Sequence, residues 1–193
     1  MAINPVVNKQ FSYGNSASSF QITRRGLQAA IFEKLEQKAK TEPAIIALKQ
    51  QLIVALKKYL KDLRDSNYQK VTDAKKTSLL NDLRLGKITT HKFAEEFDRV
   101  QFLKPENLST KDLWPFLSDD QKIVNRQSAI RKIMNQIAEK IAGVFIDANY
   151  ISREQLLIKN EKGELFQTED PEAQPVYKFT YDYIKAIAEE NFR

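Results

Sequence analysis

The chain has 193 residues, no cysteine and a formal net charge of +6. Its length is sufficient for a well-packed domain, and the lack of cysteine excludes disulfides, thiolate metal sites and cysteine nucleophiles. Hydrophobic residues make up 42% and charged residues 29%, as in globular rather than disordered proteins.

Only five glycines and six prolines interrupt stretches rich in Lys, Glu, Gln, Ala, Leu and Ile, most of which favour helix. The sequence therefore predicts a mostly α fold, a helical bundle with a small C-terminal β-hairpin and a terminal helix. We expect an extended polar arm over 1–23, the bundle over 24–149 and the hairpin-plus-helix appendage over 150–193.

Charge is distributed unevenly along the chain. Residues 1–64 have 11 Lys and Arg against 4 Asp and Glu, whereas residues 151–193 have 6 against 9. This asymmetry predicts an acidic partner for the front half or head-to-tail contacts between copies. Oligomerisation is thus an open alternative.

Two helices are expected at the start of the bundle. Thr23 is suited to capping the first, which has Leu27, Ile31 and Leu35 on one stripe. Pro43 is suited to the first turn of a second helix of about 20 residues. The apolar face of that second helix contains Ile45, Leu48, Leu52, Leu56, Tyr59 and Leu63.

Two further helices are predicted in the middle of the chain. Asp73 is a candidate cap for a third helix that Gly86 ends in the left-handed conformation. Thr89 or Thr90 would cap the fourth, and Pro105 would end it. The inward face of the fourth helix would consist of Phe93, Phe97 and Val100.

Capping signals precede the next two helices. Ser109 and Asp112 form a capping-box pattern for a short helix that Trp114-Pro115-Phe116 interrupts. Ser118 and Gln121 form a second such pattern, which opens the longest helix. Its apolar stripe predicts that it runs to about Ala148. That stripe contains Ile123, Ile130, Met134, Ile137, Ile141, Val144 and Phe145.

The C-terminal segment has a different pattern. Gln155–Lys159 and Glu164–Gln167 are predicted strands of a β-hairpin, joined by a turn at Asn160–Gly163. Residues 176–183 alternate aromatic and polar side chains and fit either a strand or a helix. We predict a short extended entry there, followed by a helix to about Glu190.

No catalytic, metal or cofactor site is predicted. His91 is the only histidine, and with Glu95 four residues on it could form half of a metal pair. A metal site needs more ligands than this pair supplies, so an exposed first-turn histidine is the preferred interpretation. The chain also lacks phosphate-binding glycine loops and a nucleophile elbow. We therefore predict no enzyme activity and no cofactor.

Basic residues in the first two predicted helices suggest a nucleic-acid surface. Lys57, Lys61 and Arg64 are spaced i, i+4, i+7 on one helix, and Arg24 and Arg25 begin the other. Such cations could neutralise phosphates. A solvated lysine face gives the same pattern, so nucleic-acid binding is the alternative prediction.

Aromatic residues supply the candidate protein-binding anchors, because Trp and Tyr are enriched at interface hot spots. They are Phe11, Tyr13 and Phe20 in the arm, Trp114 and Phe116 before the longest helix, and Tyr181 near the C-terminus. Sealing the domain's own core is the competing explanation for them.

These observations favour a non-catalytic protein-binding module, a subunit, adaptor or accessory factor whose partners are other protein subunits. A secreted bacterial or phage interaction protein is the second alternative. No classical secretory signal is present, and the longest apolar run, Ile141–Ile146, is too short to span a membrane. We therefore expect a cytoplasmic protein.

Overall fold

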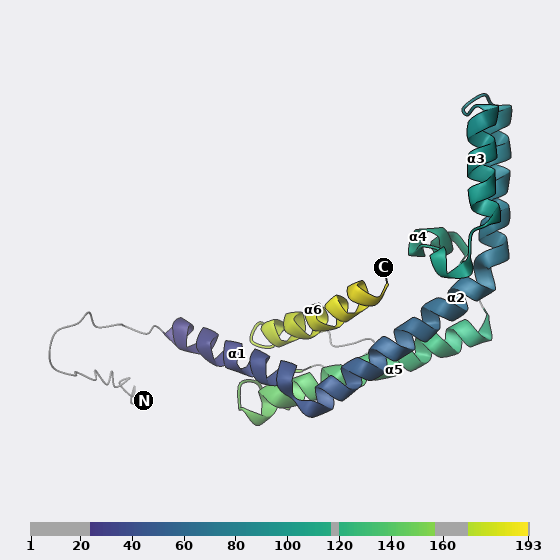
Figure 1. Ribbon diagram of the computed structural model, residues 1–193. Coiled ribbons are helices and arrows are strands. Elements are labelled where there is room, and N and C mark those ends of the chain that lie inside the picture. The colour runs from purple at the N-terminus through teal and green to yellow at the C-terminus, as the bar shows by residue number, and fades with distance from the viewer. Residues whose placement is uncertain (1–23, 117–119, 157–169, 193) are drawn as a thin grey trace, which may run out of the picture.

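The computed structural model describes residues 24–116, 120–156 and 170–192. These residues form six α-helices with three short 3-10 turns between them (Figure 1). The α-helices are α1 (Arg24–Thr41), α2 (Pro43–Arg84), α3 (Thr90–Gln101), α4 (Thr110–Leu113), α5 (Gln121–Asp147) and α6 (Gln174–Asn191). The 3-10 turns are η1 (Pro105–Asn107), η2 (Trp114–Phe116) and η3 (Arg153–Gln155). The prediction of a helical bundle is confirmed.

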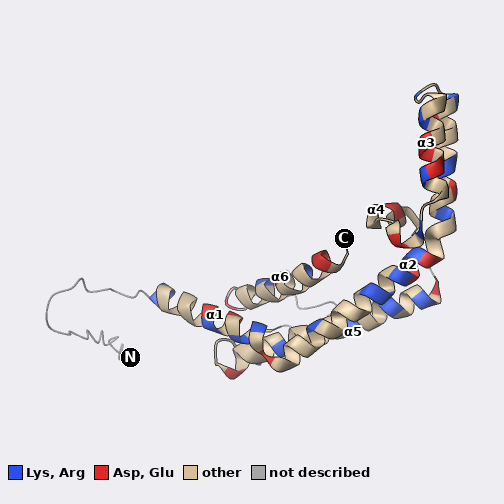
Figure 2. Ribbon diagram, viewed as in Figure 1, with Lys and Arg blue, Asp and Glu red and all other residues tan. Residues whose placement is uncertain are grey.

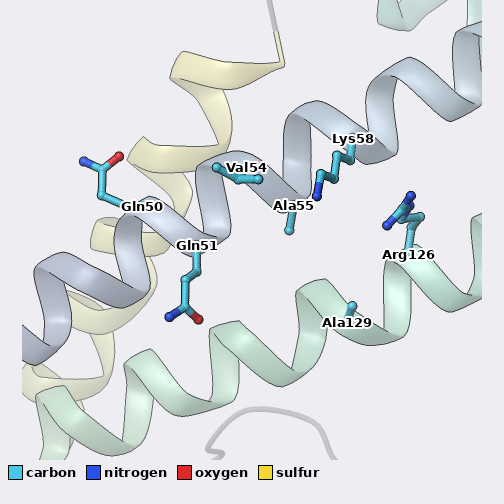
Figure 3. A pocket seen from close by; sticks show the side chains of 7 residues that line it. All are labelled: Gln50, Gln51, Val54, Ala55, Lys58, Arg126 and Ala129. Carbon is cyan, nitrogen blue, oxygen red and sulfur yellow. The ribbon is translucent and has the colours of Figure 1, made fainter.

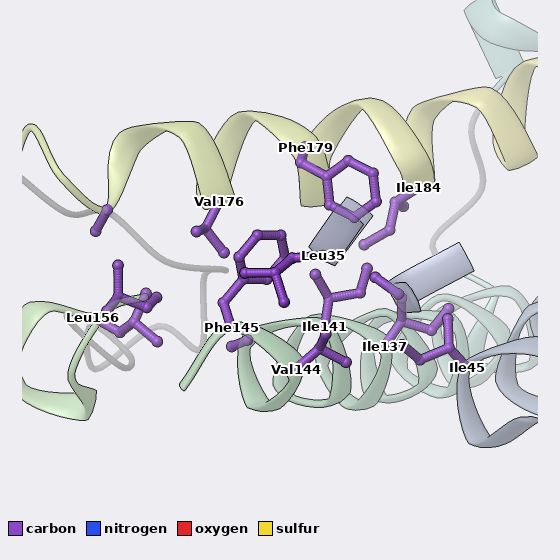
Figure 4. Packing of buried hydrophobic residues seen from close by; sticks show 14 of the residues in the cluster. Leu35, Ile45, Ile137, Ile141, Val144, Phe145, Leu156, Val176, Phe179 and Ile184 are labelled. Atoms are coloured by element: carbon purple, nitrogen blue, oxygen red, sulfur yellow. The ribbon is translucent and has the colours of Figure 1, made fainter. Parts of the chain in front are cut away.

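The main core lies where α1, the first half of α2, α5 and α6 meet, and we call these four elements the bundle. Phe145 of α5 is fully buried at its centre, with its ring centroid 5.2 Å from Phe32 of α1 and 6.1 Å from Phe179 of α6. Apolar side chains of α5 and α6 point toward one another across this core (Figure 4). Burial of these side chains is the main stabilising term.

A second, smaller core lies beside the middle of α2, where α4 and the start of α5 meet it. Its buried members are Leu60, Leu63, Val71, Leu108, Leu113 and Ile123. Arg64 Nε donates to the Leu108 carbonyl at 2.9 Å, and Tyr68 Oη donates to the Leu103 carbonyl at 2.7 Å. These two bonds attach the segment after α3 to α2.

Beyond this second core, the end of α2 and the whole of α3 extend away from the bundle as a pair of helices (Figure 1). We call this part, residues 73–101, the projection. None of its residues is buried. The side chains of Phe93, Phe97 and Val100, predicted to point inward, are half-buried.

Several predicted helix boundaries are confirmed. Pro43 occupies the first turn of α2, and Gly86 follows its end with a φ of 68°, which favours glycine. Thr89 caps α3 by accepting from the Lys92 amide at 3.2 Å. Ser109 and Asp112 form the predicted capping box at α4.

The prediction of two helices between 43 and 84 was wrong, because α2 is one continuous helix of 42 residues. Asp73 lies inside it and caps nothing. The polar residues before it bond within the helix: Asn67 Nδ2 donates to the Leu63 carbonyl at 2.9 Å, and Thr72 Oγ1 donates to the Tyr68 carbonyl at 3.1 Å. Bonds of this kind bend helices, and α2 changes direction in this region (Figure 1).

The C-terminal β-hairpin was also a wrong prediction. No strand occurs among residues 24–116, 120–156 and 170–192. Gln155 and Leu156 were predicted to lie in its first strand. Gln155 is instead the last residue of the η3 turn, and Leu156 follows that turn. The rest of the predicted hairpin, residues 157–167, lies outside the described residues, as do the arm 1–23 and the proposed caps Thr23 and Ser118.

Two other details differ from prediction. Residues 176–183 are helical from the start, because α6 begins at Gln174 and its buried residues repeat at helical spacing. The predicted apolar stripe of α1 is buried only at Leu35, while Leu27 and Ile31 are exposed where α1 extends past the bundle. The predicted ends of α5 and α6 agree with the structure to within a residue.

None of the helices in the described part of the chain combines the length and the apolar composition needed to cross a bilayer.

Candidate protein-binding surfaces

The described aromatic anchors differ in their surroundings. Trp114 is 72% exposed on the η2 turn and Tyr181 is 60% exposed on α6. Phe116 is half-buried and packs against the second core, so its first role is structural. Phe11, Tyr13 and Phe20 lie outside the described residues.

Tyr181 borders an apolar groove between α5 and α6 with a volume of about 580 Å³. Its lining residues are Met134, Tyr177, Thr180, Tyr181, Ile184, Lys185 and Ala188. Thr180 and Ile184 are buried and form the floor. The Thr180 hydroxyl donates to the Val176 carbonyl at 2.9 Å, so the floor's one hydroxyl already has a partner.

The composition of this α5–α6 groove suits apolar ligands. Among the described residues, Lys185 is the only charged one that lines the groove, and its ammonium lies 3.7 Å from the Glu189 carboxylate on the same helix. An apolar side chain entering the groove would lose contact with water without leaving a charge unpaired. The groove can therefore hold an apolar group of a partner.

The predicted nucleic-acid residues fall into two separate places. Arg24 and Arg25 form the first turn of α1, which extends past the bundle (Figure 2). Lys57, Lys61 and Arg64 line one hollow of about 400 Å³ beside α2. The same hollow is lined by Leu60, Asp65, Glu106 and Asn191.

Part of the charge in this hollow is compensated, because the carboxylates Asp65 and Glu106 line it together with the three cations. The Lys61 ammonium lies 2.6 Å from the Asp65 carboxylate, and this hydrogen bond raises the pKa of Lys61. Arg64 is held by the Leu108 carbonyl. Neither Lys57 nor Arg64 forms an ion pair among the described residues. The hollow is therefore a weaker phosphate site than the spacing predicted.

A larger basic surface, which the sequence analysis missed, lies along α2 and α5. Residues 43–61 contain four Lys and no Asp or Glu, and residues 121–138 contain four Lys and Arg and no Asp or Glu. The two segments lie side by side (Figure 2). The sequence hides this signal, because residues 105–150 as a whole contain as many Asp and Glu as Lys and Arg, with the carboxylates before and after residues 121–138.

Asp62 joins these two segments. It is only 7% exposed, and its two carboxylate oxygens accept from Lys122 Nζ at 3.0 Å and Arg126 Nε at 2.9 Å. The hydrogen bond from Arg126, followed by that from Lys122, lowers the pKa of Asp62 below its usual value. The carboxylate therefore stays ionised at neutral pH and joins α2 to α5.

Next to this ion cluster, α2 and α5 enclose a shallow groove of about 400 Å³ (Figure 3). We call it the α2–α5 groove. Its lining residues are Gln50, Gln51, Val54, Ala55, Lys58, Arg126 and Ala129. Lys58 and Arg126 lie at one end of it and the two glutamines at the other (Figure 3).

His91 is exposed in the first turn of α3. Among the described residues, no three His, Asp or Glu side chains lie close enough together to hold a metal ion. The described residues therefore supply no further ligand to the metal pair that His91 and Glu95 could form.

No protein-family model, curated protein or solved structure matches this chain.

Proposed function

We propose that this chain is a non-catalytic protein-binding module, a subunit, adaptor or accessory factor that docks a partner protein in the α5–α6 groove. The observation that carries the proposal is the groove itself, in which the exposed Tyr181 stands beside the buried floor residue Ile184. A large exposed aromatic next to an apolar hollow is a typical interface anchor.

The groove is built on packed helices. Val176, Phe179 and Ile187 of α6 are buried in the bundle core, which fixes the helix that presents Tyr181. A partner would meet a preformed surface, so little ordering entropy would be lost on binding. This supports stable docking in preference to a transient encounter.

The test compares capture of partners from native lysate by three tagged proteins: wild type, Tyr181→Ala and Phe102→Ala. Phe102 is 77% exposed and follows α3, away from the groove, so it is a matched control for loss of an exposed aromatic. We expect the same partner with wild type and Phe102→Ala and its loss with Tyr181→Ala. Circular dichroism must show equal helix content in all three.

Treating half of each lysate with nuclease tests the alternative of nucleic-acid binding. That alternative is supported by the hollow that gathers Lys57, Lys61 and Arg64. Partners that disappear with nuclease and do not depend on Tyr181 would contradict the protein-binding proposal and favour the basic surface. Partners that survive nuclease and depend on Tyr181 would support it.

A further inference from the structure

The surplus positive charge of the protein is concentrated on the α2–α5 pair. Residues 43–61 and 121–138 together contain eight Lys and Arg and no carboxylate, more than the net charge of +6 for the whole chain. Opposite charges elsewhere cancel one another, as in the pairs of Lys92 with Glu96 and Lys178 with Asp182. A partner for this pair of helices should therefore be acidic.

The neighbouring carboxylates do not neutralise this surface. Asp65 pairs with Lys61 alone, and Asp62 is shared by Lys122 and Arg126, so two carboxylates face three of the eight cations. Lys58 forms no ion pair within the described residues, although it lines the α2–α5 groove together with Arg126. An uncompensated positive charge is left at this end of the groove.

The floor between the charged and the amide ends is apolar. Val54 is 51% exposed, and Ala55 and Ala129 lie beside it on facing helices. Small side chains at such positions let another helix approach closely, and an exposed valine offers it an apolar contact. Recognition of an amphipathic helix uses this combination of apolar groove and flanking charge.

We propose that the α2–α5 groove binds an acidic amphipathic helix of a partner protein. Its apolar face would cover Val54, Ala55 and Ala129, and its carboxylates would face Lys58 and Arg126. Single-stranded nucleic acid fits the groove less well, because none of the described lining residues is aromatic. Base stacking depends on aromatic side chains.

This inference does not rest on the α5–α6 groove. The lining residues of the two grooves do not overlap. Substitutions in the α2–α5 groove should therefore not change the capture of the partner that docks at Tyr181. In turn, Tyr181→Ala should not change peptide binding in the α2–α5 groove. The two proposals fail independently.

The experiment measures fluorescence anisotropy of three labelled probes with the full chain at matched salt. The first is a peptide of about 18 residues, five helical turns, with Leu spaced to form one apolar face and Glu on the others. The second is a scrambled peptide of the same composition, and the third is a short DNA duplex. We expect the amphipathic peptide to bind about tenfold more tightly than either.

Two variants separate docking in the groove from simple charge attraction. Lys58→Glu should weaken peptide binding about tenfold, whereas Lys111→Glu, the same charge change at an exposed position on α4, should weaken it much less. Ala129→Arg adds a positive charge but fills the groove. Docking predicts weaker binding by this variant, whereas general attraction predicts stronger binding.

Three results would overturn the proposal. They are equal affinity for the amphipathic and scrambled peptides, tighter binding of the peptide by Ala129→Arg, and preference for the DNA duplex over both peptides. The last result would assign the α2–α5 pair to nucleic acid. Circular dichroism of each variant establishes that lost binding does not come from lost helix.

Discussion

Helix α2 passes through two regions that are stabilised in different ways. In the bundle, its residues Ile45, Leu52 and Leu56 are almost completely buried. In the projection, from residue 73 onward, no residue of α2 or α3 is more than half-buried. Because most helical stability in proteins comes from tertiary packing, one helix here has a strongly supported half and a weakly supported end.

The projection is held together by local interactions. Within α3, the Glu96 carboxylate pairs with Lys92 at 2.9 Å and with Arg99 at 2.8 Å. The ring centroids of Phe93 and Phe97 lie 5.4 Å apart. The Lys76 ammonium of α2 lies 5.7 Å from the centre of the Phe97 ring. Exposed ion pairs contribute little to stability. We therefore expect the projection to open locally more often than the bundle does.

The largest expected effect is that of Phe145→Ala, which empties the centre of the bundle core. Phe145 is fully buried and contacts aromatic rings of α1 and α6, so the variant should lose about 3–5 kcal/mol of unfolding free energy. Denaturant unfolding followed by circular dichroism measures it. A loss below about 1 kcal/mol would mean that the bundle is not the stable region.

Phe97→Ala tests the other region. Its ring is half-buried between α3 and α2, so about 1–2 kcal/mol of local stability should be lost. Hydrogen exchange should become about tenfold faster for residues 73–101 and stay unchanged in α5. Equal acceleration in α5 would show that the two regions open together.

Asp62→Asn tests the attachment of α5 to α2 just before the projection. We expect the unfolding free energy to fall by about 1 kcal/mol at neutral pH, because two charge-assisted hydrogen bonds are weakened. Denaturant unfolding measures this change. Asp65→Asn, which disturbs only an exposed pair with Lys61, is the control and should cost less.

The same variant has a predicted pH dependence. The pKa of Asp62 is lowered in the folded state from an ordinary value of 3.8, so its contribution is fully present above that value. It is lost as the pH falls through the lower folded-state pKa. The difference in unfolding free energy between wild type and Asp62→Asn should therefore become smaller in acid. A difference that stays constant down to a pH of about 2 would contradict a stabilising role of the ionised Asp62 carboxylate.

The smallest expected effect is that of Thr89→Ala, which removes the cap of α3. The loss should be about 0.5–1 kcal/mol and confined to the projection, as seen by hydrogen exchange. Thr90→Ala, at the first residue of α3 and one position after the cap, is the control. Similar effects of the two substitutions would show that the Thr89 hydroxyl does not cap the helix in solution.

Local signals explain what was predictable from the sequence. Pro43, Gly86 and the Ser109–Asp112 pair act within a few residues of themselves, and each marks a helix boundary as expected. The pattern of residues 176–183 fits both a strand and a helix. Packing against α1, α2 and α5 decided between them in favour of helix.

Long-range contacts explain what was missed. Asp73 and the polar residues before it favour a break, but α2 stays helical there because α4 and the η1 segment pack against it, with Arg64 bonded to the Leu108 carbonyl 44 positions away. The α2–α5 groove also depends on two segments far apart in sequence. Lys58 and Arg126 become neighbours only when α5 folds back along α2.

The continuity of α2 has a mechanical consequence. At 1.5 Å per residue its 42 residues follow a helix axis about 63 Å long, which changes direction on the way (Figure 1). The helix is unbroken between its first half, which borders the α2–α5 groove, and its end in the projection. While the projection is folded, two molecules bound at these places would therefore be held at a spacing and an angle that α2 and its bend determine.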